Sequence, residues 1–204
     1  MFRNIGFIAI IGFFLTACSS NNTKKIIIVA TGDINVNMDA KTITLAGGAG
    51  ANDKTVDFNH AGPLTLTLKD EGGKSTPITV NDNGYFILNA RKDTIAGAYQ
   101  NYSAPKTKVD TIKQETIERG IDSLSQLIEG KNISAANRNF FVTPGNVVKI
   151  TANVDAFVVP PFHRMTSIEK VGDKEPEVYR FYTIHEVKEE LAKLKALTAP
   201  PPVK

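Results

Sequence analysis

The chain has 204 residues, with 24 Lys and Arg against 21 Asp and Glu, one Cys and no Trp. This length suits one domain, and 42% apolar with 22% charged residues is ordinary globular composition, which argues against a largely disordered chain. A single Cys excludes a disulfide framework, and a single long apolar run excludes a polytopic membrane protein. The near-neutral charge offers no basic face, so we expect no nucleic-acid partner.

Residues 1–17 are predicted to be a targeting segment. Arg3 supplies a short positive region, and an almost wholly apolar run extends from Ile5 to Leu15. This run is too short to cross a bilayer, which takes roughly 20 helical residues, but it suits the apolar core of a signal peptide.

The tetrapeptide Leu15-Thr16-Ala17-Cys18 follows directly and contains the only Cys of the chain. It resembles the lipobox of bacterial lipoproteins, in which an aliphatic residue and two small residues precede the Cys. The resemblance implies cleavage before Cys18, lipid attachment at Cys18 and anchoring in a membrane. Ser19 in place of Asp implies delivery to the outer membrane, and the periplasmic or surface face stays open. Residues 18–25 are polar and are predicted to be a flexible tether.

The first half of the remaining chain is predicted to be β-structure. Ile26–Ala30 is a short continuous apolar run, and Leu64–Leu68 alternates apolar with polar residues. Continuous apolar runs of this length and period-two patterns are typical of buried and half-buried strands.

Turn residues separate the expected strands. Gly47–Gly50 is small and lacks the Lys-Ser/Thr of a phosphate-binding loop, so we expect a hairpin loop there. Asn83-Gly84 tolerates positive φ at both turn positions, which suits a tight hairpin. We therefore expect Thr76–Val80 to pair with Tyr85–Asn89.

Helical patterns appear twice in the second half. Residues 111–129 carry apolar side chains on one helical face, and Thr183 with Glu186 forms a capping box that begins a helix over 183–197. Residues 198–204 contain three consecutive prolines and are predicted to be a disordered tail.

Strand patterning resumes between the two helices. The expected architecture is therefore α+β and mainly β: one antiparallel β-sandwich-like domain over 26–197, with an inserted helix and a C-terminal helix.

Ring-bearing side chains gather between Pro160 and Thr183. They could form a platform for a glycan or a peptide, or they could be the packing that seats the last helix, which we favour. The candidate ligand-binding residues are Phe162, His163, Tyr179, Phe181 and Tyr182.

Motifs for catalysis or metal binding are absent from the sequence. His185-Glu186 lacks the second His of the zinc-protease motif, because Glu189 stands at that position. The three histidines are dispersed, so we expect no metal and no cofactor.

The leading expectation is a non-enzymatic, lipid-anchored envelope protein with a structural or protein-interaction role. The alternative is a lipoprotein that binds a glycan or a peptide. A hydrolase with a dispersed site is less favoured. Two or more histidines within about 5 Å of a carboxylate would support it.

Overall fold

A computed structural model describes residues 22–100, 114–134, 136–164 and 175–198 of the chain. The predicted signal peptide, the lipobox with Cys18, residues 18–21 of the predicted tether and the tail at 199–204 lie outside these residues. The predicted tether extends too far, because residues 23–25 belong to the first β-strand and Lys24 is fully buried. Neither helix in the described part has the length and apolarity needed to span a membrane.

The described residues form two β-sheets and two helices, so the predicted mainly β fold class is confirmed. The larger sheet has the strand order β4-β3-β2-β1-β5-β8. Its strands are β1 (Thr23–Asn37), β2 (Thr42–Asn59), β3 (Leu64–Lys69), β4 (Ser75–Val80), β5 (Gly84–Asn89) and β8 (Val147–Thr151).

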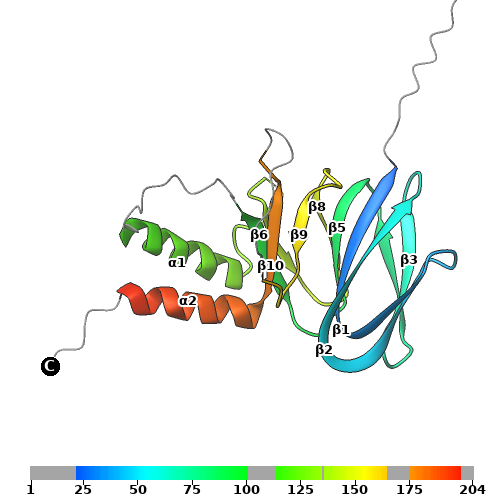
Figure 1. The fold of residues 1–204 in the computed structure, drawn as a ribbon, viewed down its shortest axis with the longest axis horizontal. Helices are drawn as coiled ribbons and strands as arrows, with labels where there is room; N and C mark the ends of the chain where they lie inside the picture. Colours follow the sequence, from blue (N-terminus) through cyan, green and yellow to red (C-terminus); the bar gives the residue numbers. More distant parts are fainter. Residues whose placement is uncertain (1–21, 101–113, 135, 165–174, 199–204) are drawn as a thin grey trace, which may run out of the picture.

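The smaller sheet has the order β7-β6-β10-β9 and carries the helices on one face. Its strands are β6 (Ile95–Gln100), β7 (Asn139–Val142), β9 (Phe157–Val159) and β10 (Val178–Thr183), and the helices are α1 (Gln114–Ile128) and α2 (Ile184–Thr198). Figure 1 shows the resulting layers: the curled larger sheet, the smaller sheet, and the helix pair. The predicted purely antiparallel arrangement is wrong, because both sheets are mixed: β1–β5, β2–β3 and β9–β10 pair in parallel. Each of these parallel pairs is joined by other strands or loops rather than by a tight hairpin, so turn signals in the sequence do not reveal it.

The centre of the fold is the parallel pair β1–β5, which is buried on both faces. Ile26 and Ile28 enter a first core enclosed by the larger sheet, whose outer strands β4 and β8 approach each other. Ile27 and Val29 enter a second core between the two sheets. A strand covered on both faces is apolar at successive positions, which explains the continuous run at the start of β1.

The predicted hairpin between β4 and β5 is wrong. β4 pairs with β3, whereas β5 pairs with β1 and β8. Every residue from Tyr85 to Leu88 is buried, so β5 belongs in the middle of the sheet. β4 alternates between exposed and buried residues and contains Pro77, which an edge strand tolerates.

The predicted hairpin loop at Gly47–Gly50 is also wrong, because this segment lies within β2. It stands opposite a shift in the β1–β2 register between Thr31 and Asp33. Gly32 has a φ of 81°, and a Cβ on Gly32 would lie 2.7 Å from the Gly48 backbone nitrogen. The glycines therefore permit the close backbone approach of a β-bulge.

Helix α2 begins with the N-terminal capping box that the sequence predicted. The Glu186 backbone N–H donates to Thr183 Oγ1 at 3.2 Å, and the Thr183 N–H donates to Glu186 Oε2 at 2.8 Å. This reciprocal pair is the predicted capping box. α1 and α2 pack against each other, with Leu194 of α2 lying beside Gly120 of α1.

Glu177 joins the two sheets just before β10. Its carboxylate accepts hydrogen bonds from the Tyr179 hydroxyl at 2.6 Å, Thr151 Oγ1 at 2.9 Å and Asn153 Nδ2 at 2.9 Å. Burial alone would raise the pKa of Glu177, but these bonds and the nearby Arg138 charge outweigh it and lower the pKa. Burial and the same carboxylate raise the pKa of Tyr179 to about 12.

Two glycines give opposite expectations for substitution by alanine. Gly120→Ala should raise the free energy of unfolding by about 1 kcal/mol, because alanine favours helix. Its Cβ would also make an ordinary contact 3.5 Å from Leu194 Cδ1. Gly97→Ala should lower the free energy of unfolding by about 1–3 kcal/mol, since the Phe181 ring occupies the space of the new methyl group. Urea unfolding measures both, and a destabilised Gly120→Ala variant would contradict the packing of α1 on α2.

The Glu177 carboxylate should make stability depend on pH. Its pKa is lower in the folded chain than the unfolded value of 4.5, so its contribution is complete above about 4.5 and is lost as the pH falls through the folded value. Glu177→Gln should cost about 1–3 kcal/mol at neutral pH and flatten this acid dependence. Urea titrations from pH 3 to 7 measure the effect. Glu190→Gln, on the exposed side of α2, is the control, and an equal acid dependence in wild type and Glu177→Gln would contradict the assignment.

Candidate functional site

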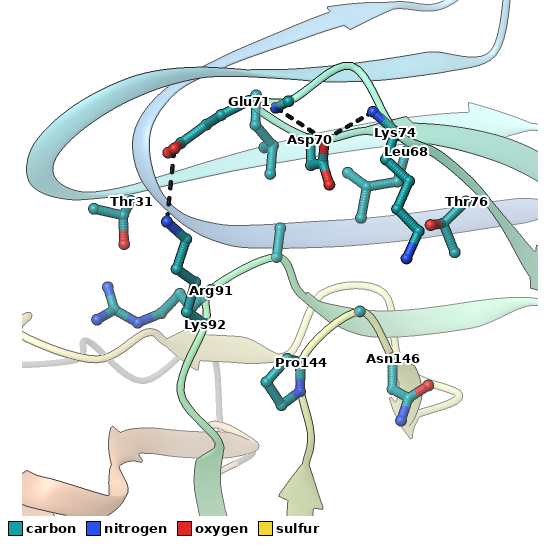
Figure 2. Close-up of a pocket in the computed structure, with 14 residues that line it drawn as sticks. Thr31, Leu68, Asp70, Glu71, Lys74, Thr76, Arg91, Lys92, Pro144 and Asn146 are labelled. Carbon is teal, nitrogen blue, oxygen red and sulfur yellow. Dashed lines mark hydrogen bonds and ion pairs between the residues drawn. The ribbon is translucent and has the colours of Figure 1, made fainter.

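A cleft of about 750 Å³ opens between three turns at one end of the larger sheet. Figure 2 shows the turn between β3 and β4 on one side, with the β5–β6 connection and the β7–β8 turn facing it. Its lining residues are Thr31, Leu45, Leu68, Asp70, Glu71, Gly72, Lys74, Thr76, Ala90, Arg91, Lys92, Pro144, Gly145 and Asn146. A volume of this size falls within the range of small-ligand sites.

The floor of the cleft is aliphatic. Leu45 and Leu68 belong to the first core but keep 8% and 6% of their surface exposed, and Ala90 also lines the cleft. Pro144 lies across the cleft from Leu68 (Figure 2). The cleft thus lies at one end of the first core, where a small part of the surface of these leucines is exposed.

Asn89, which ends β5, positions two walls of the cleft. It is fully buried, and its side-chain amide donates to the Val142 carbonyl at 2.8 Å and to the Asp93 carbonyl at 2.9 Å. Its Oδ1 accepts the Arg91 N–H at 3.1 Å, and its backbone pairs with Gly145 and Asn146 of the β7–β8 turn. The side chain and backbone of one residue therefore hold the β5–β6 connection beside the β7–β8 turn.

The acidic groups of the cleft already have partners. Asp70 Oδ1 accepts the backbone N–H of Gly72 at 3.0 Å and of Lys74 at 2.8 Å, which closes the β3–β4 turn. Glu71 Oε2 lies 3.7 Å from Lys92 Nζ, and Figure 2 shows this pair spanning the cleft. Both side chains of that pair are exposed, so the ion pair contributes little free energy.

The three cations of the cleft differ in how far they are engaged. Arg91 is only 12% exposed, and its Nε donates to Asp93 at 2.8 Å. Lys92 pairs with Glu71, as described above. Lys74 is exposed, and Figure 2 shows its side chain directed across the cleft toward the β7–β8 turn. Within the described residues, its ammonium has no ion-pair or hydrogen-bond partner.

A strained aromatic residue stands beside the cleft. Phe162 has a φ of 67°, is 53% exposed, and lies with its ring 5.2 Å from the Arg91 guanidinium. Its backbone N–H donates to Glu186 Oε1 at 3.2 Å, so the helix-capping carboxylate also holds this turn. A bulky residue at positive φ costs free energy and persists because its surroundings hold it in place.

Two of the three histidines lie beside a carboxylate, the distance condition that would support a hydrolase. His163 Nε2 lies 2.7 Å from Asp53, and His185 Nε2 lies 3.2 Å from Glu189. His185 and Glu189 are four residues apart on the surface of α2, a common helix contact. Neither histidine lines the cleft, so the histidine–carboxylate pairs and the cleft do not form one site.

The candidate ligand-binding residues are divided among three places. Tyr179 and Phe181 are buried in the second core. Tyr182 packs against a third core, formed by Ala96, Leu127 and Val187 between the smaller sheet and the helices. Phe162 and His163 lie on the connection after β9. The Phe162 ring contacts Arg91, which lines the cleft, but neither Phe162 nor His163 lines the cleft itself. Ligand binding by these residues stays a prediction. Sequence reasoning missed the cleft because Gly72-Gly73 and Pro144-Gly145 signal turns but not their convergence.

Among the described residues, no three His, Cys, Asp or Glu side chains gather as metal ligands. Comparison with protein-family models, curated proteins and solved structures finds no match to this chain. The residues and their geometry are therefore the basis for any functional assignment.

Asn89→Asp should destabilise the protein by more than about 2 kcal/mol, because the new carboxylate cannot donate to the two buried carbonyls. Asn52→Asp, on the exposed part of β2, should change stability by less than about 0.5 kcal/mol. Chemical unfolding measures both variants. Equal stability of Asn89→Asp and wild type would contradict the described role of Asn89.

Proposed function

We propose that this chain is a lipid-anchored protein of the cell envelope, held in the outer membrane through Cys18, that binds a partner at the cleft. The lipobox Leu15-Thr16-Ala17-Cys18 after an apolar run supports the anchor. The cleft with its aliphatic floor supports an interaction role. The partner of this proposal is another molecule of the envelope, and no cofactor takes part.

The observation that carries the proposal is the position of the cleft relative to the start of β1. Thr23 begins β1, and Thr31 on the same strand lines the cleft. Eight residues of strand span about 27 Å, so the cleft lies about that far along β1 from the point where a tether from Cys18 would enter. An anchored chain would hold its cleft away from the bilayer, where a partner has access.

The start of β1 is held by hydrogen bonds to the neighbouring loops, so its position relative to the cleft is fixed by the fold. Lys24 is fully buried, and its ammonium donates to the His60 carbonyl at 2.9 Å and to Asn83 Oδ1 at 2.6 Å. Burial lowers the pKa of Lys24, with Asp82 opposing and Lys149 adding to the shift. The His60 backbone N–H also donates to the Asn22 carbonyl at 3.2 Å. Few residues remain between Cys18 and this attachment, so the domain would stay close to its anchor.

The full-length chain and a Cys18→Ala variant, expressed in bacteria with two membranes, test the anchor. Wild type should fractionate with the outer membrane, and its intact mass should correspond to a chain that begins at Cys18 and carries acyl groups. Cys18→Ala should lack the added mass, and Ser20→Ala should behave as wild type. An unacylated wild-type chain that is soluble like Cys18→Ala would overturn the proposal.

A further inference from the structure

We propose that the cleft binds the carboxyl-terminal end of a peptide that has an aliphatic last side chain. This inference rests on the binding role proposed above and names its ligand. Three features of the cleft support it: the unpaired ammonium of Lys74, the aliphatic floor, and two carboxylates close to that ammonium. Lys74, Asp70 and Glu71 all belong to the β3–β4 turn, which we call the acidic rim of the cleft.

The unpaired ammonium supplies one positive charge for an anion. Lys74 crosses the cleft without a partner among the described residues, whereas Arg91 is held by Asp93 and by the Ala30 carbonyl. A lysine binds an anion as a compact point charge, and a guanidinium free to make two parallel bonds would favour phosphate. Asp70 and Glu71 on the same turn would repel a dianion. A carboxylate therefore fits this rim better than a phosphate.

The floor and the acidic rim fit the rest of a peptide. Leu45 and Leu68 offer apolar surface to an aliphatic side chain, and Pro144 lies across the cleft from Leu68. Asp70 uses Oδ1 for the β3–β4 turn, which leaves Oδ2 to accept a peptide N–H. The weak Lys92–Glu71 pair lies across the cleft and can open at small cost to admit the chain.

A glycan fits this cleft less well. Sugar rings stack on aromatic faces, and the lining residues include none; the ring of Phe162 lies behind Arg91 and is engaged with it. The carboxyl end of a peptide uses the ammonium, the floor and the acidic rim together.

Binding of fluorescently labelled Ala-Ala-Leu to the full-length chain in detergent tests the proposal, with the labelled C-terminal amide as the matched ligand. Anisotropy should show that the free acid binds at least about tenfold more tightly than the amide, because the amide lacks the charge. Lys74→Met should weaken binding of the acid about tenfold and leave the amide unchanged. Lys188→Met, which removes an exposed lysine from α2, should leave both affinities as in wild type.

A second variant tests whether the peptide binds in the cleft. Thr76 lines the cleft on the edge strand β4, so Thr76→Trp should fill it and abolish binding while the chain remains folded by circular dichroism. Equal binding of acid and amide, unchanged discrimination in Lys74→Met, or no binding at all would overturn the proposal. Binding of a neutral oligosaccharide in place of the peptide, lost in Thr76→Trp, would also overturn it.

The Cys18→Ala chain separates failure of this inference from failure of the proposed anchor. It keeps the cleft and lacks the lipid, so it should bind the free acid with wild-type affinity. Peptide binding by an unacylated wild-type chain would overturn the anchor alone. An acylated chain that binds no peptide would overturn the ligand assignment alone.

Discussion

The burial of β1 and β5 on both faces is the constraint on which the rest of the structure depends. Alternate side chains of this parallel pair enter two different cores, so neither strand can carry charge along its middle. The polar residues stand at the ends instead, where Lys24 and Asn89 are both buried and fully engaged. One end ties the entering chain to neighbouring loops, and the other organises the turns around the cleft.

Local sequence patterns predicted the parts of this fold that depend on neighbouring residues. The alternation in β3 and β4 and the capping box of Thr183 and Glu186 are formed by residues close in sequence, and the structure confirms them. Strand pairing is different in kind. The chain bends at Asp82 and Asn83, but β5, which begins at Gly84, pairs with distant β1, because its two apolar faces need cover on both sides.

The cleft also depends on contacts between residues that are distant in sequence, so local patterns could not predict it. Its walls come from separate segments, and the residue that aligns two of them, Asn89, looks in the sequence like an ordinary polar residue after an apolar run. Nothing in the sequence indicated how the ring-bearing residues would be distributed in the fold. On β10, Tyr179 and Phe181 face one core and Tyr182 faces another, because the strand is central and covered on both sides. Proximity in sequence does not place residues on one surface when each strand alternates.

A single strand connects the proposed anchor with the proposed binding cleft. β1 begins at Thr23, contributes side chains to both cores, and reaches the cleft at Thr31 just before the register shift at Gly32. Because its interior residues are buried on both faces, this part of β1 has little freedom to bend. The bulge at Gly32 and Gly48 lies just past Thr31 and allows the paired strands β1 and β2 to bend there. The same two-sided burial that closes the cores would therefore hold the cleft at a fixed distance from the start of β1, where a tether from Cys18 would enter.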